Sequence, residues 1–183
     1  MANVAPPEPG ELAEVLIVIS KAAVADRLEA IFPGLGSYAT KRYEPERQRR
    51  QAIWARRYPD TPMVGFAPEA LVLSPDYILD YAKDHARIDS ERVGEDQVGV
   101  RSEPIARRVL RSLWTLQEDV LTVSHLQRCF RIPASHLVDF VVHGAGVTGD
   151  KALDGDDLFV CARSMRVIVF HHERWVFDVT REA

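Results

Sequence analysis

The segment TVSHLQRCFRIPASHLVDFVV, residues 122–142, contains the pattern from which the predicted fold follows. Apolar residues recur at helical spacing in its first part and again from Leu137 onward, and Ile132 and Pro133 interrupt the pattern between the two parts. Thr122 stands where a helix N-cap is expected. Pro133 can begin a second helix, because the N–H that proline lacks would have no partner there. The segment therefore predicts two short helices joined by a tight turn, which is a helix-turn-helix.

The residues on both sides of this segment complete a predicted domain. Ser102 and Pro104 are typical of a helix start, and apolar residues then recur at helical spacing as far as Leu116. After the segment, β-branched and aromatic residues predict three short strands over 158–162, 166–170 and 175–179. Trp175, Phe177 and Val179 should share one face of the last strand. We therefore expect a mostly helical α+β fold, with a winged-helix-like domain over residues 101–183.

The 122–142 segment resembles the helix-turn-helix of bacterial and phage transcription regulators, in the repressor family whose motif runs T-V-x-x-V-A-x-x-A-G-V-S-x-x-T-V-x-x-V-L. The matching residues are Thr122, Val123, Leu126, Phe130, Ile132, Leu137, Phe140 and Val141. Gln127, Arg131 and Pro133 depart from the small residue, the turn glycine and the serine cap of that motif. The resemblance implies a repressor-like transcriptional regulator that binds a specific sequence of double-stranded DNA.

A DNA-binding role would place particular side chains on the DNA. The residues expected to face base edges are Ala134, Ser135, His136 and Asp139, and those expected to contact phosphates are Arg128 and Arg131. The Asp139 carboxylate can accept a hydrogen bond from cytosine N4, but it repels phosphates. The motif is therefore also compatible with binding a protein.

A second basic cluster lies within residues 41–57. It includes Arg47, Arg49, Arg50, Arg56 and Arg57, with Tyr43, Trp54 and Tyr58 interleaved. Arginines interleaved with aromatic residues suit a surface that follows a phosphate backbone. The alternative is a solvent-exposed helix over about 45–57 with Ile53 and Trp54 packed inward.

The overall charge limits this interpretation. The chain has 183 residues and a formal net charge of -4, which argues against a strong nucleic-acid binder, since lysine and arginine contacts to phosphates provide most non-specific affinity. However, 19 of its 23 basic residues are arginine, which binds phosphates and carboxylates through two parallel hydrogen bonds. Net acidity, Asp139 and the acidic segment 76–96 favour a second hypothesis, a protein–protein module such as an antitoxin or inhibitor on a winged-helix scaffold. A homodimer fits either hypothesis.

The N-terminal part is expected to comprise a flexible tail over 1–10 and a helical region over 11–93. Residues 11–31 allow two interpretations: a strand at 15–19 followed by a helix capped by Ser20, or a single helix from Pro9 to about Ile31. The acidic first turn and the lack of an obvious partner strand favour the single helix. Further on, the sequence predicts a loop with a short extended piece at 71–73, a helix from Ser74-Pro75 to about Arg87, and a domain boundary near 94–99.

The sequence gives little sign of catalytic or metal chemistry. Cys129 and Cys161 are expected to be buried, reduced thiols, and without a secretory signal or membrane segment the protein is expected in the cytoplasm. His171, His172 and Glu173 are adjacent, but neighbouring side chains of a strand point to opposite faces, so only His171 and Glu173 could share a side. We therefore expect no metal, no cofactor and no enzyme activity. A structure whose largest cleft gathers His171, Glu173 and another ligand would instead favour an enzyme.

Overall fold

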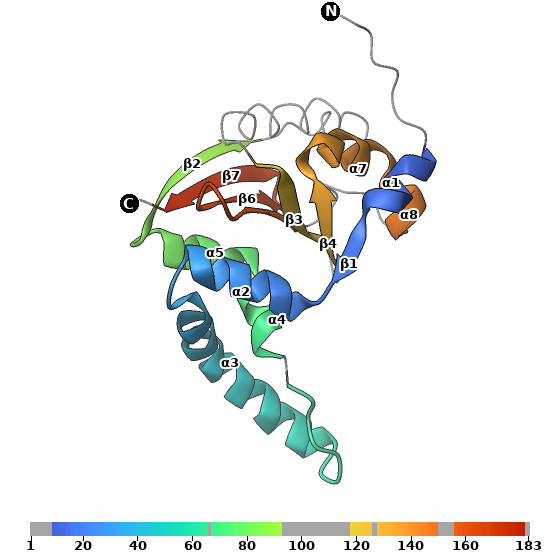
Figure 1. Cartoon of the computed structure of the whole chain (residues 1–183). Coiled ribbons are helices and arrows are strands. Elements are labelled where there is room, and N and C mark those ends of the chain that lie inside the picture. The colour runs from blue at the N-terminus through green and yellow to red at the C-terminus, as the bar shows by residue number, and fades with distance from the viewer. Residues whose placement is uncertain (1–8, 66, 93–117, 126–127, 150–155, 182–183) are drawn as a thin grey trace, which may run out of the picture.

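An antiparallel β-sheet is the centre of the fold (Figure 1). In the computed structural model, which describes residues 9–65, 67–92, 118–125, 128–149 and 156–181, seven strands form this one sheet. In their order across the sheet, the strands are β1 (Ile17–Ile19), β4 (Arg128–Pro133), β3 (Val120–His125), β5 (Asp157–Cys161), β6 (Arg166–His171), β7 (Trp175–Arg181) and β2 (Ala86–Arg92). The five central strands all come from residues 120–181, and the N-terminal half of the chain adds a strand at each edge.

The predicted helix-turn-helix is wrong, and with it the mostly helical winged-helix-like fold. Strands β3 and β4 form a hairpin, in which Leu121 pairs with Ile132 and Val123 pairs with Phe130. All four are buried and lie on one face of the sheet. An apolar residue at every second position also satisfies several positions of a helical stripe, so this short pattern fits both periods. The pairing between β3 and β4 therefore determines the hairpin, because the spacing of the apolar residues alone does not.

The second half of the predicted motif is helical, although it starts later than expected. Pro133 ends β4, a short 3-10 helix η2 (Ala134–His136) follows, and α7 (Leu137–His143) then begins. Leu137, Phe140 and Val141 form the buried stripe of α7, as their spacing predicts. The chain continues into α8 (Ala145–Thr148).

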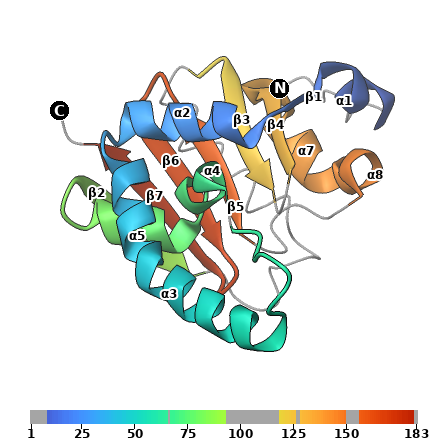
Figure 2. The ribbon, with the colours of Figure 1, turned by 90° about the horizontal axis from the view of Figure 1, so that it is seen from below.

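Helices cover both faces of the sheet. On one face, Val24 and Leu28 of α2 (Lys21–Ile31) and Ile78 of α5 (Pro75–Ala82) belong to the same buried cluster as alternate residues of β5, β6 and β7 (Figure 2). On the other face, α7 and Leu12 of α1 (Pro9–Val15) pack against β3, β4 and β5. Every residue of β5 is buried, which explains why β5 reads as a continuous apolar run after Asp157.

The single helix predicted over residues 9–31 is also wrong. The chain forms α1, then β1, then α2, which is the strand-plus-helix alternative. Ser20 caps α2, since its Oγ accepts a hydrogen bond from the Ala23 N–H at 3.1 Å. The partner of β1 is β4, more than a hundred residues along the chain. The residues near β1 in the sequence do not indicate that β4 is its partner.

Helix α3 (Leu35–Arg57) is longer than the helix predicted over 45–57 and contains Pro45. Its buried residues, Leu35, Ala39 and Tyr43, are all in its first half, and the second half projects away from the sheet (Figure 1). Helix α4 (Pro68–Val72) replaces the extended piece predicted at 71–73. Helix α5 begins at Pro75 as predicted, but it ends at Ala82, and β2 takes the residues expected to finish it.

The three C-terminal strands lie where the sequence predicts them, and Trp175, Phe177 and Val179 share a face of β7. They belong to the large sheet and do not form a wing. Three predicted features lie wholly or mostly outside the described residues: the tail over 1–10, the boundary near 94–99 and the helix from Ser102 to Leu116. Within the part of the chain that the structure describes, no helix is both long and apolar enough to cross a membrane.

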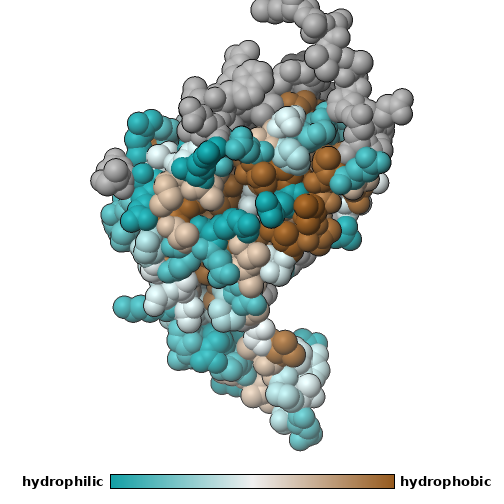
Figure 3. All heavy atoms as spheres, viewed as in Figure 1, coloured by the Kyte–Doolittle hydropathy of each residue, from teal (hydrophilic) through white to brown (hydrophobic). Residues whose placement is uncertain are grey.

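Hydrophobic side chains reach the surface along one edge of the sheet. In the space-filling view, hydrophobic residues gather where β4 and β1 lie (Figure 3). In β1, Ile17 is 56% exposed and Val18 is 71% exposed.

Candidate metal centre

The turn between β6 and β7 brings two histidine side chains together. His171 is the last residue of β6, and its carbonyl accepts a hydrogen bond from the Arg174 N–H at 2.8 Å, which closes a tight turn. Arg174 has a φ of 67°, in the left-handed region. His172 lies in this turn and not in a strand, so the alternation of strand side chains does not apply to it. The two imidazole rings have centroids 4.1 Å apart, and the expectation that they point to opposite faces is wrong.

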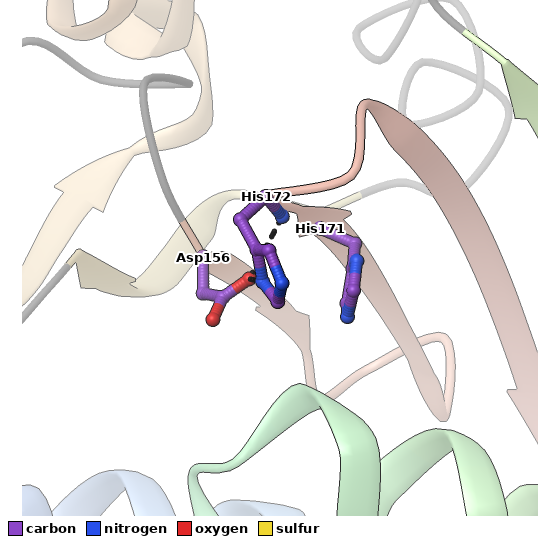
Figure 4. A group of neighbouring side chains, drawn as sticks. All are labelled: Asp156, His171 and His172. Carbon is purple, nitrogen blue, oxygen red and sulfur yellow. Dashed lines mark hydrogen bonds and ion pairs between the residues drawn. The ribbon is translucent and has the colours of Figure 1, made fainter.

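Asp156, directly before β5, contacts the second histidine (Figure 4). Its Oδ1 lies 2.9 Å from His172 Nδ1 and also accepts a hydrogen bond from the His172 backbone N–H at 2.9 Å. The side-chain hydrogen bond to Asp156 raises the pKa of His172, with a smaller Coulombic contribution from the same carboxylate. One possible ligand atom from each of Asp156, His171 and His172 lies within 4.8 Å of the other two. Such a group of side chains can hold a metal ion.

His171 has two further contacts, which determine where its proton lies. Its Nδ1 accepts a hydrogen bond from the Glu173 N–H at 3.2 Å, and its Nε2 lies 3.2 Å from Oδ1 of Asp76 in α5. Because Nδ1 accepts a hydrogen bond, the proton of the neutral ring is on Nε2 and is donated to Asp76. Asp76 therefore fixes the orientation and the tautomer of His171.

A buried pair anchors the strand that follows Asp156. Asp157 begins β5 and lies opposite His125 of β3, with Asp157 Oδ1 2.5 Å from His125 Nδ1. Both side chains are almost completely buried, and the imidazole packs against the Phe140 ring in a T-shaped arrangement with centroids 6.2 Å apart. This contact holds the first residue of β5 in place, and so also the adjacent Asp156.

A groove of about 460 Å³ adjoins the histidine cluster. Trp175 and Phe177, whose rings stack at a centroid distance of 6.1 Å, give it an apolar wall. Its other lining residues are Arg42, Asp76, Leu79, Asp80, Lys83, His171 and Glu173. Within it, hydrogen bonds from Tyr38 and Lys83 lower the pKa of Asp80. The groove thus combines an apolar wall with charged groups, as small-molecule sites do.

This groove gathers His171 and Glu173 with a further carboxylate, Asp76, although it is not the largest cleft. A groove of about 690 Å³ between α3 and Pro68 is larger, and its lining includes no histidine. The sequence points to His171 and Glu173 through their adjacency, but it does not point to Asp76 or Asp156. Asp76 is 95 residues from His171 along the chain and meets it only because α5 packs against the sheet.

The structure does not gather the residues predicted to bind DNA around 128–139 into one surface. Arg128 and Arg131 lie on opposite faces of β4: Arg128 donates to the Thr148 carbonyl, and Arg131 lines a different groove together with Arg27 of α2. Ala134, Ser135 and His136 form η2, and His136 Nδ1 lies 3.4 Å from Asp139 Oδ2 in the first turn of α7.

The predicted arginines of residues 41–57 all lie in the second half of α3, on the other side of the sheet from α7 (Figures 1 and 2). Arg47 forms an ion pair with Glu44, and Arg49 and Arg50 both pair with Glu46. Arg56 and Arg57 end the helix, with the Arg57 guanidinium 5.7 Å from the centre of the Tyr58 ring. Three of these five arginines are therefore engaged by glutamates one turn away.

Comparison with known proteins adds no further constraint on this site. No protein-family model, curated protein or solved structure matches the chain.

Proposed function

We propose that this protein binds a divalent transition-metal ion through Asp156, His171 and His172. The observation that supports the proposal is the convergence of three possible ligand atoms within 4.8 Å of one another. Two imidazoles and one carboxylate form a ligand set that zinc and iron(II) sites use. In a tetrahedral site with zinc–nitrogen bonds of about 2.0–2.1 Å, neighbouring ligand atoms are roughly 3.4 Å apart. The 2.9 Å between Asp156 Oδ1 and His172 Nδ1 and the 4.8 Å limit for the whole group lie on either side of that spacing.

The contacts of His171 indicate which of its nitrogens would bind the metal. A ligand nitrogen must offer a lone pair, and hydrogen bonding to Asp76 leaves the lone pair on Nδ1. Coordination through Nδ1 would replace the hydrogen bond from the Glu173 N–H and keep the hydrogen bond from Nε2 to Asp76. Asp76 would then be the outer carboxylate that orients a metal-bound histidine, an arrangement common in zinc sites.

Among the residues that the structure describes, three possible ligands converge, and this count favours a reactive centre over a purely structural one. Structural zinc sites are usually closed by four protein ligands, whereas three protein ligands leave a position for water or a substrate. The groove lined by Trp175 and Phe177 shares His171 with the cluster, so a small molecule in it would lie beside the metal. A metal-bound water is a strong nucleophile near neutral pH. Metal-assisted hydrolysis of a small ligand with an apolar or planar part is the reaction class that this arrangement supports.

Metal titration tests the proposal. Protein stripped with a chelator is titrated with Zn²⁺ by calorimetry and with Co²⁺ by visible absorption, which reports the coordination geometry. We expect one site per chain, and its affinity should fall at least about tenfold in His172→Ala and in Asp156→Asn, since each loses a ligand. His143→Ala, which changes a histidine of α7 outside the cluster, is the matched control and should bind as the wild type does. Equal binding by all four proteins would refute the site.

Binding of double-stranded DNA, by contrast, stays a prediction without the helix-turn-helix on which it was based. Among the described residues, the predicted basic surface that is left is residues 44–57 of α3, where five arginines outnumber two glutamates. Because Glu44 and Glu46 already engage three of these arginines, this surface offers weaker support than the metal cluster.

A further inference from the structure

The two edges of the sheet differ in how they are protected from pairing with another strand. An exposed edge strand offers unpaired N–H and C=O groups, and charged residues or proline normally discourage pairing there. β2 follows this rule: four of its seven residues are charged and exposed, namely Arg87, Asp89, Glu91 and Arg92. β1 has the sequence Ile-Val-Ile, with no charge and no proline.

The β1 edge is also open and apolar. Among the residues that the structure describes, β1 pairs with β4 on one side, and no strand lies on the other. Val18, its central residue, is 71% exposed, and Ile17 is 56% exposed. Hydrophobic residues gather at this side of the molecule (Figure 3). An edge of this kind is a site for pairing with another strand.

We propose that β1 pairs in antiparallel fashion with β1 of a second copy of this chain, joining the two sheets into one. A two-fold axis perpendicular to the sheet at Val18 places Val18 opposite Val18 and Ile17 opposite Ile19. All three residues then find an apolar partner, and each face of one sheet continues into the same face of the other. Identical strands related by a two-fold axis are complementary to themselves, which is the usual geometry of homodimers.

The charges that flank β1 favour this arrangement. The exposed Glu14 lies before the strand, at the end of α1, and Lys21 follows it, at the start of α2. Antiparallel pairing turns the acidic end of β1 in each copy, where Glu14 lies, toward the basic end of the other, where Lys21 lies. Parallel pairing would instead put like charges side by side, which destabilises neighbouring strands. The flanking charges therefore match a second copy in the antiparallel orientation.

The dimer leaves the candidate metal centre accessible. Four inter-strand spacings separate β1 from β6, which corresponds to about 19 Å across the sheet. Dimerisation through β1 therefore does not depend on metal binding, and either property can be absent without the other.

Cysteine cross-linking tests the pairing register. Directly opposed residues of antiparallel strands have Cα atoms about 4.5–5.5 Å apart, within reach of a disulfide. Under mild oxidation, Val18→Cys should give a covalent dimer that reductant reverses. Ser90→Cys, exposed on the β2 edge, is the matched control and should stay monomeric on a denaturing gel. The native thiols should not interfere, since Cys129 and Cys161 are both buried and burial raises the pKa of Cys161 to about 12.

Mass measurement gives the second readout. Light scattering over a wide concentration range should show wild-type particles of twice the 20.6 kDa chain mass. Val18→Lys sets two ammonium groups against each other across the two-fold axis and should halve the mass, while Ser90→Lys should not. Circular dichroism checks that both variants are folded. A wild-type monomer, including one whose β1 pairs only with a strand from another protein, overturns the proposal. A dimer that persists in Val18→Lys, or a Val18→Cys protein that does not cross-link, also overturns it.

Discussion

Removing the Asp157 carboxylate tests the role of the buried pair beneath the candidate metal centre. Asp157 has no exposed surface, and its Oδ1 lies 2.5 Å from Nδ1 of His125, which is itself 1% exposed. Removing one partner of a buried pair leaves the other desolvated without its counterpart, which costs about 3–5 kcal/mol. We therefore expect Asp157→Ala to lower the free energy of unfolding by that amount.

This loss is large relative to the stability of a typical domain. Domains unfold with a free energy of roughly 5–15 kcal/mol, so the variant would lose about a third or more of an average value. For a chain of this length, each kcal/mol lowers the melting temperature by roughly 2–4 °C, which gives an expected decrease of about 6–20 °C. Asp157→Asn keeps the shape of the side chain and one hydrogen-bond acceptor, and should cost less, about 1–3 kcal/mol.

Urea unfolding followed by tryptophan fluorescence and by circular dichroism measures the effect. The midpoint should fall while the dependence on denaturant stays constant, because the surface exposed on unfolding does not change. Asp119→Ala is the control: Asp119 pairs with Arg163 at 2.9 Å with its side chain 84% exposed, and such a pair contributes less than about 1 kcal/mol.

A double substitution separates the interaction between His125 and Asp157 from the packing of each side chain. Replacing both His125 and Asp157 by leucine removes the polar pair together, so it should be less destabilising than the sum of the two single replacements. If Asp157→Ala costs less than about 1 kcal/mol, or if the two single effects add, then the pair is not coupled and the reasoning is refuted.

Three other predictions follow from individual contacts. Asp76→Asn should weaken metal binding about 10–100-fold in the titrations above, because His171 loses the carboxylate that orients it; unchanged affinity would exclude that role. Hydrogen bonds from arginines lower the pKa of Glu44 and Glu46 from 4.5 to about 2. The contribution of these two carboxylates to stability is therefore full above about pH 4.5 and is lost as the pH falls toward 2. Carboxyl NMR titrations with midpoints near 4.5 would contradict this. Gly144→Ala should cost about 1–3 kcal/mol in urea unfolding, because a Cβ at Gly144 would overlap the Phe140 carbonyl; wild-type stability would contradict the clash.

Local sequence signals predicted several elements correctly. Ser74-Pro75 marks the start of α5, and Leu137, Phe140 and Val141 form the buried stripe of α7. The β-branched and aromatic runs that end the chain form β5, β6 and β7. In each case, a cap residue, a helical stripe or a β-branched run lies within a few residues of the structure it specifies. Such signals depend on backbone sterics and on contacts between residues that are close in the sequence, so the sequence alone is enough to predict them.

Tertiary pairing decided what local patterns left ambiguous. The apolar residues of β3 and β4 fit a helix or a strand, and the pairing of these strands with each other and with β1 and β5 selects the strand. The acidic first turn near Glu11 favoured a continuous helix, yet β1 interrupts it because β4 offers a partner strand more than a hundred residues away. No local pattern can specify a contact at that separation.

The candidate metal centre likewise depends partly on local sequence and partly on tertiary structure. The adjacency of His171 and His172 can be read from the sequence, but the alternation of side chains in a strand predicts that they point to opposite faces. They converge because β6 ends at His171, so that His172 lies in a turn. Asp156 and Asp76 come from the start of β5 and from α5, and only packing across the sheet brings them to the histidines. The sequence by itself determined the side-chain chemistry available to the site; the tertiary structure determined which of those side chains meet, because their contacts form between segments distant in the chain.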